Sequence, residues 1–282
     1  MHQLITLMGK KATTSRLCLL LDVSRSGFYA AQSRRAQPAV VTEEQVHLRA
    51  AFDSSGHTYG SRRLCQAMRA RGFKLGRHRT RTLMRQLQLR VCWRRKFCHT
   101  TDSKHSLPVA PNLLDRQFRP PAANQAWACD ITYIRTGSGW LYLAAVLDLY
   151  SRKVVGWAMA PSMPAQLACS ALQMAITLRQ PAPGLMVHSD RGSQHASAAH
   201  QQLLADYQII GSISRNGNRW DNAVMERFFL NLKMERVWQR SYANHAEARC
   251  DITDYIVNFY NTQRLHSALG YLSPLAYEQA NA

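Results

Sequence analysis

Long apolar runs and closely spaced cysteines are both missing from this sequence. Apolar residues never continue for the ~18 positions that a membrane-spanning helix requires. The first residues, MHQLITLMGKKATTSR, lack the positive, apolar and small-residue order of an export signal, so we expect a cytoplasmic protein with no membrane partner. The seven cysteines contain no CxxC pair, which argues against a zinc or redox centre. Cys92, Cys98 and His99 come nearest to a metal cluster but lack a second ligand pair.

Acidic residues are scarce in the first part of the chain. Residues 1–120 hold 23 Lys and Arg against 6 Asp and Glu, a net charge of +17, whereas residues 121–282 hold 13 against 11. Such one-sided positive charge is typical of a surface that releases counterions from a polyanion, with a merely solubilising cationic surface as the alternative. The nearly neutral remainder fits a folded core, so two differently charged units are expected.

Two segments of the basic part have helix-turn-helix spacing. Residues 15–35 combine an apolar helical run, a short DVS break and a second helix. Residues 59–73 predict a helix that stops at Gly72, and residues 77–90 predict a second helix with a basic start. Such a helix either enters a DNA groove and neutralises phosphates or is a solvated helix over a small core. The DNA-binding candidates of this region are arginines: Arg62, Arg63, Arg77, Arg79, Arg81 and Arg85.

Prolines separate this region from the rest of the chain. Periodicity is lost where Pro108, Pro111, Pro120 and Pro121 accumulate, which predicts a linker. The expected organisation is a helix-turn-helix-like region, a second, DNA-binding helix-turn-helix, the linker, and a larger domain with a C-terminal helical extension. These parts are assigned to residues 1–56, 57–100, 101–122 and 123–282.

Beyond the linker, the pattern predicts an α/β fold. Strands and helices are expected in the order βββαβαβα, at residues 127–135, 139–150, 153–160, 164–180, 185–190, 197–208, 209–214 and 221–239. This order indicates a mixed sheet. A strand, helix, strand connection packs back onto the same sheet, so the strands of Asp130 and Asp190 are expected side by side. A last helix is expected within residues 248–274, with a Ser-Pro stop.

Three acids stand out among the eleven beyond residue 120. Asp130 lies within a strand, where a carboxylate is costly to bury without a partner or a metal. Asp190 ends a buried strand, and ligands of open α/β sheets gather at that edge. Glu226 lies on a partly apolar helix, either facing solvent or directed into a site. The other acids receive ordinary roles: Asp148 at a turn, Asp221 as a helix cap, and Asp206 and Glu235 at exposed helix positions.

Gathered at one sheet end, three carboxylates would raise one another's pKa values unless cations held them. Oxygen ligands suit Mg²⁺ or Mn²⁺. Two such ions about 4 Å apart can activate a hydroxyl and stabilise the leaving oxygen of an in-line phosphoryl displacement. The pattern therefore points to phosphodiester cleavage or transfer.

The same residues carry a family resemblance. Asp130, Asp190 and Glu226, the last two separated by 35 residues, resemble the D,D-35-E triad of retroviral-type integrases and bacterial insertion-sequence transposases. WACDITYI, LDLYSRKVVGW, HSDRGSQ, WDNAVMERFF and HSALGYLSP resemble the second open-reading-frame product of the IS3 family, and YGSRRL resembles its helix-turn-helix segment. The resemblance covers residues 12–278.

The resemblance implies a ribonuclease H-like fold, with a mixed five-stranded sheet and flanking helices, preceded by an all-α helix-turn-helix region. It implies a DNA transposase of the DDE polynucleotidyl transferase class, which cuts and joins DNA at the ends of an insertion sequence. Two Mg²⁺ or Mn²⁺ ions are implied, with Asp130 bridging both and Asp190 and Glu226 each holding one.

Partners follow from the same resemblance. They are double-stranded DNA of transposon ends and target, at least one further copy of the chain, and an upstream-frame helix-turn-helix protein that is fused or bound. The expected location is the bacterial nucleoid.

Further residues of the motifs keep two interpretations each. Lys233 lies seven residues after Glu226, on the same helical stripe, and matches the family's basic residue; an ordinary solvated lysine is the alternative. His188 is either catalytic or a satisfied core histidine, and Arg264 and His266 either bind phosphate or cap a helix. The remaining DNA-binding candidates near the triad are Arg191, Gln194 and Asn222.

Two other functions share part of the pattern. A metal-dependent nuclease of the same fold would cut DNA without strand transfer, and a non-catalytic DNA-binding regulator would need only the helical region. The regulator is disfavoured because the three acids and Lys233 are all present. A tyrosine or serine recombinase would need a nucleophile with an Arg/His cluster, which the motifs do not supply.

Overall fold

Short helices form the N-terminal part of the protein, as the computed structural model shows. The structure describes residues 2–8, 12–36, 41–92, 110–215 and 219–281. Cys98 and His99, and part of the predicted linker 101–122, lie outside the described residues. Contacts divide the chain into two units, residues 1–47 and 48–282. The domain boundaries predicted from the sequence stay predictions.

The first unit contains α1 (His2–Met8), α2 (Thr14–Leu20) and α3 (Arg25–Ala36). Ile5, Leu17, Cys18 and Phe28 form its small core. Asp22, at a φ of +50°, lies in the turn between α2 and α3, so the helix pair predicted for residues 15–35 is confirmed. Helix α1 was not predicted.

The helical part of the second unit contains α4 (Glu43–Ser54), α5 (Ser61–Ala70) and α6 (Arg77–Gln86). Leu48, Leu64, Met68 and Leu83 are buried together in its core. Gly72, at a φ of +88°, ends the turn after α5, as predicted. The predicted pair α5 and α6 is confirmed, whereas α4 was not predicted.

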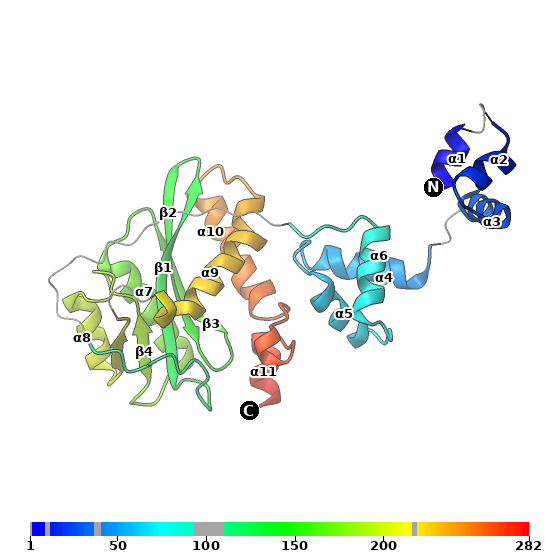
Figure 1. Ribbon diagram of the computed structural model, residues 1–282. Coiled ribbons are helices and arrows are strands. Elements are labelled where there is room, and N and C mark those ends of the chain that lie inside the picture. The colour runs from blue at the N-terminus through cyan, green and yellow to red at the C-terminus, as the bar shows by residue number, and fades with distance from the viewer. Residues whose placement is uncertain (1, 9–11, 37–40, 93–109, 216–218, 282) are drawn as a thin grey trace. The chain divides into compact units, whose positions relative to one another are not determined.

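A five-stranded mixed sheet forms the rest of this unit, which confirms the predicted α/β class (Figure 1). The strand order is β3-β2-β1-β4-β5. Strands β1, β2 and β3 pair antiparallel, while β4 pairs parallel to β1 and β5 parallel to β4. The bounds are β1 Ala126–Thr136, β2 Gly139–Asp148, β3 Val154–Ala160, β4 Met186–Ser189 and β5 Ile210–Ile213.

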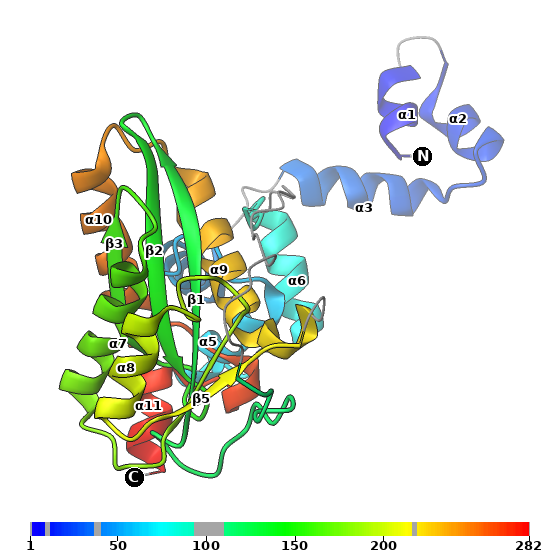
Figure 2. The same cartoon turned by 90° about the vertical axis from the view of Figure 1, so that its left-hand side faces the viewer.

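Alternate residues of the strands enter two separate cores. Trp127 and Cys129 of β1 pack with α7 (Ala165–Arg179), whereas Ala126 and Ala128 pack with α9 (Ala223–Glu235). Helix α8 (Ala198–Asp206) lies with α7, and α10 (His245–Asp254) with α9, on opposite faces of the sheet (Figure 1). In Figure 2, α7 and α8 lie toward the viewer. Even-numbered positions of β1 therefore face α9, because successive side chains point to opposite faces.

The C-terminal extension differs from the single helix predicted within residues 248–274. Helix α10 continues into a π-helical turn, η3 (Tyr255–Tyr260), and a short 3₁₀ turn, η4 (Ser267–Leu269), follows. The Ser-Pro pair that was expected to stop a helix instead starts α11 (Pro274–Ala280). The Ser273 hydroxyl caps this helix by accepting a hydrogen bond from the Ala276 amide. Proline is tolerated in the first turn of a helix, because the backbone amide that it lacks would have no partner there. No helix in the described ranges is long and apolar enough to cross a bilayer.

Candidate active site

Asp130, within β1, and Asp190, directly after β4, lie at matching positions of two neighbouring strands. Strands β1 and β4 are parallel neighbours, with Cys129 paired to Ser189. Each aspartate is the next residue after that pair, so the two lie at matching positions. The predicted adjacency of the two strands is confirmed.

Asp130 is half-buried on the side of β1 that faces α9. Its Oδ1 accepts a hydrogen bond of 2.7 Å from the Ile131 amide. Burial and then the neighbouring charges of Asp190 and Glu226 raise the pKa of Asp130 well above its ordinary value, while Lys233 acts in the opposite direction. Both other predicted acids therefore act on Asp130.

Asp190 is held by the loop that follows β4. Its Oδ1 accepts from the Gly192 amide at 3.0 Å and lies 3.2 Å from Nδ1 of His195. Burial alone would raise the pKa of Asp190, but these bonds outweigh it and the pKa is lowered. Gly192 favours this approach, because a Cβ there would stand 3.0 Å from the same oxygen, a tight contact.

Glu226 lies in the first turn of α9 and is exposed. Met225, Phe228 and Phe229 are buried and anchor the helix on the sheet. Asn222, which is 6% exposed, donates to the Cys129 carbonyl at 3.4 Å and so ties the start of α9 to the strand of Asp130. Glu226 thus has features of both predicted interpretations: its side chain is exposed to solvent, and its charge raises the pKa of Asp130.

Lys233 lies two turns further along α9. Its Nζ stands 4.5 Å from the centroid of the Tyr133 ring, and its charge lowers the pKa of Asp130. A cation over an aromatic face is attracted by the ring quadrupole, which orients the ammonium group. The Lys233 ammonium group is therefore oriented by the Tyr133 ring near the acid cluster, which differs from the alternative of an ordinary solvated lysine.

A divalent cation fits this donor set. Within the described ranges, no three Asp, Glu, His or Cys side chains are already arranged as ligands of one ion. However, the crowding of like charges around Asp130 is what a bound cation relieves, and the donors are carboxylate oxygens. Glu226 is exposed on the first turn of its helix, and its charge reaches Asp130.

Comparison with known proteins identifies the family. Residues 120–219 and 207–274 match two models of an integrase core domain, and residues 42–97 match a model of an HTH-like domain. The chain is 41% identical over 269 residues to the transposase InsF for insertion sequence IS3A of Escherichia coli strain K12, covering 94% of this chain and 93% of that protein. It is also 41% identical over 265 residues to an insertion element IS600 protein of 31 kDa from Shigella sonnei, covering 93% and 97%. The chain belongs to the IS3 family of insertion-sequence transposases.

Solved structures with similar chains include viral integrases. A simian T-cell lymphotropic virus intasome chain, in complex with a PP2A regulatory subunit, matches with a TM-score of 0.49 and 16% identity, over 84% of the transposase and 74% of that chain. The HTLV-2 integrase catalytic core domain with magnesium matches with a TM-score of 0.46 and 17% identity, over 57% and 99%.

Several predicted DNA-binding residues of the transposase lie in a buried network. The Arg264 guanidinium is 1% exposed and donates two hydrogen bonds of 2.7 Å to Glu235, which is 8% exposed. Tyr255 donates to the same carboxylate, and Arg63 lies 3.7 Å from it. His266 is buried 3.3 Å from Arg264, and burial lowers its pKa to about 2. DNA contact by Arg63, Arg264 and His266 stays a prediction that would require this network to open.

Two acids were given wrong roles by the sequence pattern. Glu235 was expected to be exposed, but Arg264 covers it from a segment far along the chain. Asp221, in the 3₁₀ turn η1 (Arg219–Asn222), was expected to cap the helix. Its buried carboxylate instead accepts from Arg215, Arg116 and Asn112.

The remaining candidates, apart from the buried Asn222, keep accessible positions. Gln194 is partly exposed and donates to the Met163 carbonyl at 3.3 Å, and Arg191 is half-buried beside Asp190. The basic side chains of the helical region are exposed: Arg62, Arg77, Arg79, Arg81 and Arg85. DNA contacts by these residues stay predictions.

His188 has the environment of a core histidine. It is fully buried, with Nδ1 2.9 Å from the Ser212 hydroxyl and Nε2 3.1 Å from the Ser214 hydroxyl. Burial lowers its pKa to about 4, so the ring is neutral near pH 7. Both ring nitrogens are satisfied, which favours the structural interpretation.

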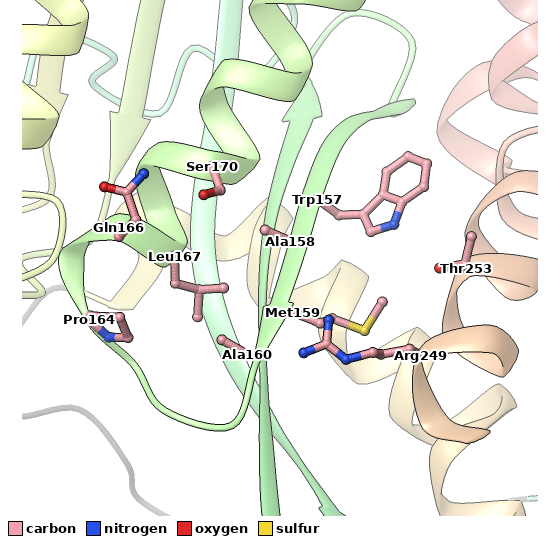
Figure 3. A pocket seen from close by; sticks show the side chains of 10 residues that line it. All are labelled: Trp157, Ala158, Met159, Ala160, Pro164, Gln166, Leu167, Ser170, Arg249 and Thr253. Atoms are coloured by element: carbon pink, nitrogen blue, oxygen red, sulfur yellow. The ribbon is translucent and has the colours of Figure 1, made fainter. Parts of the chain in front are cut away.

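A hollow on the far edge of the sheet lies apart from these residues. It is bordered by β3, α7 and α10, and Figure 3 shows Trp157 and Thr253 on one side and Leu167 and Pro164 on the other. Arg249 extends into it beside Met159. None of the predicted site residues lines this hollow.

Two residues of the acid cluster were missed by the sequence analysis. His195 bonds to Asp190 and Tyr133 holds Lys233. His195 lies five residues after Asp190 in a loop without periodicity, so its motif position HSDRGSQH was the only available signal. Tyr133 was placed only within the strand predicted for residues 127–135.

Proposed function

We propose that Asp130, Asp190 and Glu226 are the catalytic carboxylates and that together they bind two Mg²⁺ or Mn²⁺ ions. The supporting observation is the half-buried Asp130 carboxyl, whose pKa is raised by burial and by the charges of the other two acids. Structural acids of the same domain, such as Glu235, are paired with arginine instead. Carboxylates whose like charges raise the pKa of one of them are typical of a cation site.

In this proposal each group has a defined task. Asp130 would hold both ions, and Asp190 and Glu226 would each hold one. When bound, the ions would increase the nucleophilicity of a hydroxyl and neutralise charge on a phosphodiester. Lys233, oriented by Tyr133, would hold a DNA phosphate next to the acids.

The DNA-binding part of the proposal rests on charge. The exposed arginines of α6 would neutralise phosphates of the insertion-sequence ends, since Thr80 and Leu83 bury the opposite side of that helix. Gln194, Arg191 and Asn222 remain candidates nearer the triad. Joining of an end to target DNA further requires at least a second copy of the chain, which would act at the bacterial nucleoid either alone or together with an upstream-frame helix-turn-helix protein, fused or bound.

Strand transfer distinguishes this function from simple hydrolysis. The purified transposase is incubated with a labelled duplex of its own insertion-sequence end, a second duplex as target, and Mg²⁺. Labelled product joined to the target is expected, and omission of the divalent ion is expected to abolish it. Cleavage without any joined product would instead support the nuclease alternative.

A further inference from the structure

A pair of buried histidines follows Asp190. His195 and His200 are each 2% exposed, and their rings pack edge to face with centroids 5.4 Å apart. Only His195 contacts the acid cluster, with Nδ1 3.2 Å from Oδ1 of Asp190. The two rings therefore share a packing environment but differ in this one polar contact.

The backbone fixes the position of His195. Its amide donates to the Gly192 carbonyl at 3.1 Å, and its carbonyl accepts from the Gln201 side chain at 2.9 Å. Ser197, which caps α8, is bonded to the Gln194 carbonyl at 2.8 Å. The loop from Gly192 to the start of α8 is thus closed by its own hydrogen bonds, and the buried His195 ring has little freedom to turn.

Both contacts to Asp190 use the same oxygen. The Gly192 amide and His195 Nδ1 approach Oδ1, and neither uses Oδ2. An ionised carboxylate only accepts, so His195 carries its proton on Nδ1. With Oδ1 bound from two directions, the plane of the carboxylate is set, and among the described residues no hydrogen bond to Oδ2 competes with another partner.

We propose that His195 is a positioning residue for divalent-cation binding: it orients Asp190 through Oδ1 and leaves Oδ2 for the cation. This inference rests on the proposed role of Asp190 as a ligand. Residues that hydrogen-bond a ligating carboxylate restrict its rotation, and their loss typically weakens metal affinity or activity by roughly 10- to 100-fold.

Mn²⁺ binding to the full chain without DNA tests the proposal, measured by isothermal titration at one fixed pH. His195→Phe keeps a buried ring but removes the donor, and its Mn²⁺ affinity is expected to fall by roughly 10- to 100-fold. His195→Asn places an amide nitrogen near the position of Nδ1 and is expected to keep most of the affinity. His195→Gln places its amide near the position of Nε2 and is expected to weaken binding as Phe does.

His200→Phe is the matched control. The ring nitrogens of His200 make no hydrogen bond in the described part of the chain, and burial lowers its pKa to about 3, so Phe replaces a neutral, unbonded ring. Its Mn²⁺ affinity is expected to equal that of the unaltered transposase. Circular dichroism of each variant checks folding, and the Asn and Gln pair carries the test if His195→Phe does not fold.

Three outcomes would overturn the inference. Equal Mn²⁺ affinity of His195→Phe and the unaltered chain would show that the contact has no positioning role. Equal weakening by His195→Phe and His200→Phe, or by the Asn and Gln variants, would assign the effect to packing. Absence of Mn²⁺ binding by the unaltered chain would instead remove the proposed metal site itself, and the inference with it.

Discussion

Helix α9 carries two glutamates in opposite environments. Glu226, in its first turn, is exposed, and its charge raises the pKa of Asp130. Glu235, at its last residue, is 8% exposed and accepts two hydrogen bonds from the buried Arg264 and one from Tyr255. The acid at the end of the helix is thus paired with a buried guanidinium, whereas the acid in the first turn lies near a carboxylate of like charge.

The difference separates structural acids from candidate ligands. A buried carboxylate that is paired with a guanidinium stabilises the fold only as long as both partners are present. A carboxylate among like charges lowers stability unless a cation is bound, so its retention needs a functional reason. Substitutions in the acid cluster should therefore lower activity without lowering stability, whereas substitutions at Glu235 should lower stability.

Asp130→Asn should have the largest effect on activity. It removes the central carboxylate of the cluster, so the rates of strand cleavage and joining should fall by more than roughly 100-fold. That is the upper end of the loss expected when a residue that only hydrogen-bonds a metal ligand is removed. The metal-free variant should unfold at the same or a higher temperature, because a repelling charge at a site of raised pKa is removed. Gel assays of a labelled end and thermal unfolding measure the two quantities.

DNA binding serves as the control for this variant. Affinity for the insertion-sequence end, measured in the absence of divalent ions, should not fall, since the exposed arginines of the helical region are unchanged. Cleavage at the unaltered rate would mean that another acid is the central ligand.

Glu235→Gln should have the largest effect on stability. It leaves the guanidinium of Arg264 buried without its charge partner, and removal of one member of a buried pair costs roughly 3 kcal/mol or more in free energy of unfolding. Urea unfolding of Glu235→Gln and of the exposed, matched Glu226→Gln measures the contrast. Equal stability of the two variants would show that the Arg264 pair does not anchor α9.

The contrast between these two glutamates also shows which features of the fold and the site could not be predicted from the sequence. Period-two alternation in β1 and the strand, helix, strand order predicted correctly that the strands of Asp130 and Asp190 are neighbours, because both are local or topological rules. Glu235 was misplaced because its partner, Arg264, lies 29 residues away and reaches it only through the tertiary fold. His195 and Tyr133 were missed for the same reason: their roles depend on which side chain stands opposite them.

A third acid, Asp221 next to the start of α9, should show a pH-dependent effect. Hydrogen bonds from Arg215 and Arg116 hold its pKa well below the ordinary value. A depressed folded pKa gives stability that is complete above the unfolded value of about 3.9 and is lost as the pH falls below it.

Asp221→Asn should therefore lower the free energy of unfolding by about 2 kcal/mol at neutral pH, a smaller loss than at Glu235 because both arginines are about half exposed to solvent. The difference from the unaltered chain should shrink as the pH falls below 4 in urea titrations. A difference that stays constant with pH would assign the effect to packing instead of charge.

Tyr133→Leu should have the smallest effect, and it concerns the lysine that shares the acid cluster. Loss of the ring under Lys233 Nζ removes a cation–π contact of about 1 kcal/mol, equivalent to roughly a fivefold fall in the rate of strand joining if the ammonium must be oriented toward a phosphate. Tyr133→Phe keeps the ring and should behave as the unaltered transposase. Single-turnover joining assays measure both variants in the unaltered chain and in the Lys233→Ala background. Because the cation is absent from Lys233→Ala, adding Tyr133→Leu to it should cause no further loss of rate. A fall of the same size in Tyr133→Phe would point to the hydroxyl of Tyr133, and an undiminished Tyr133→Leu effect in the Lys233→Ala background would show that the ring acts on something other than the lysine.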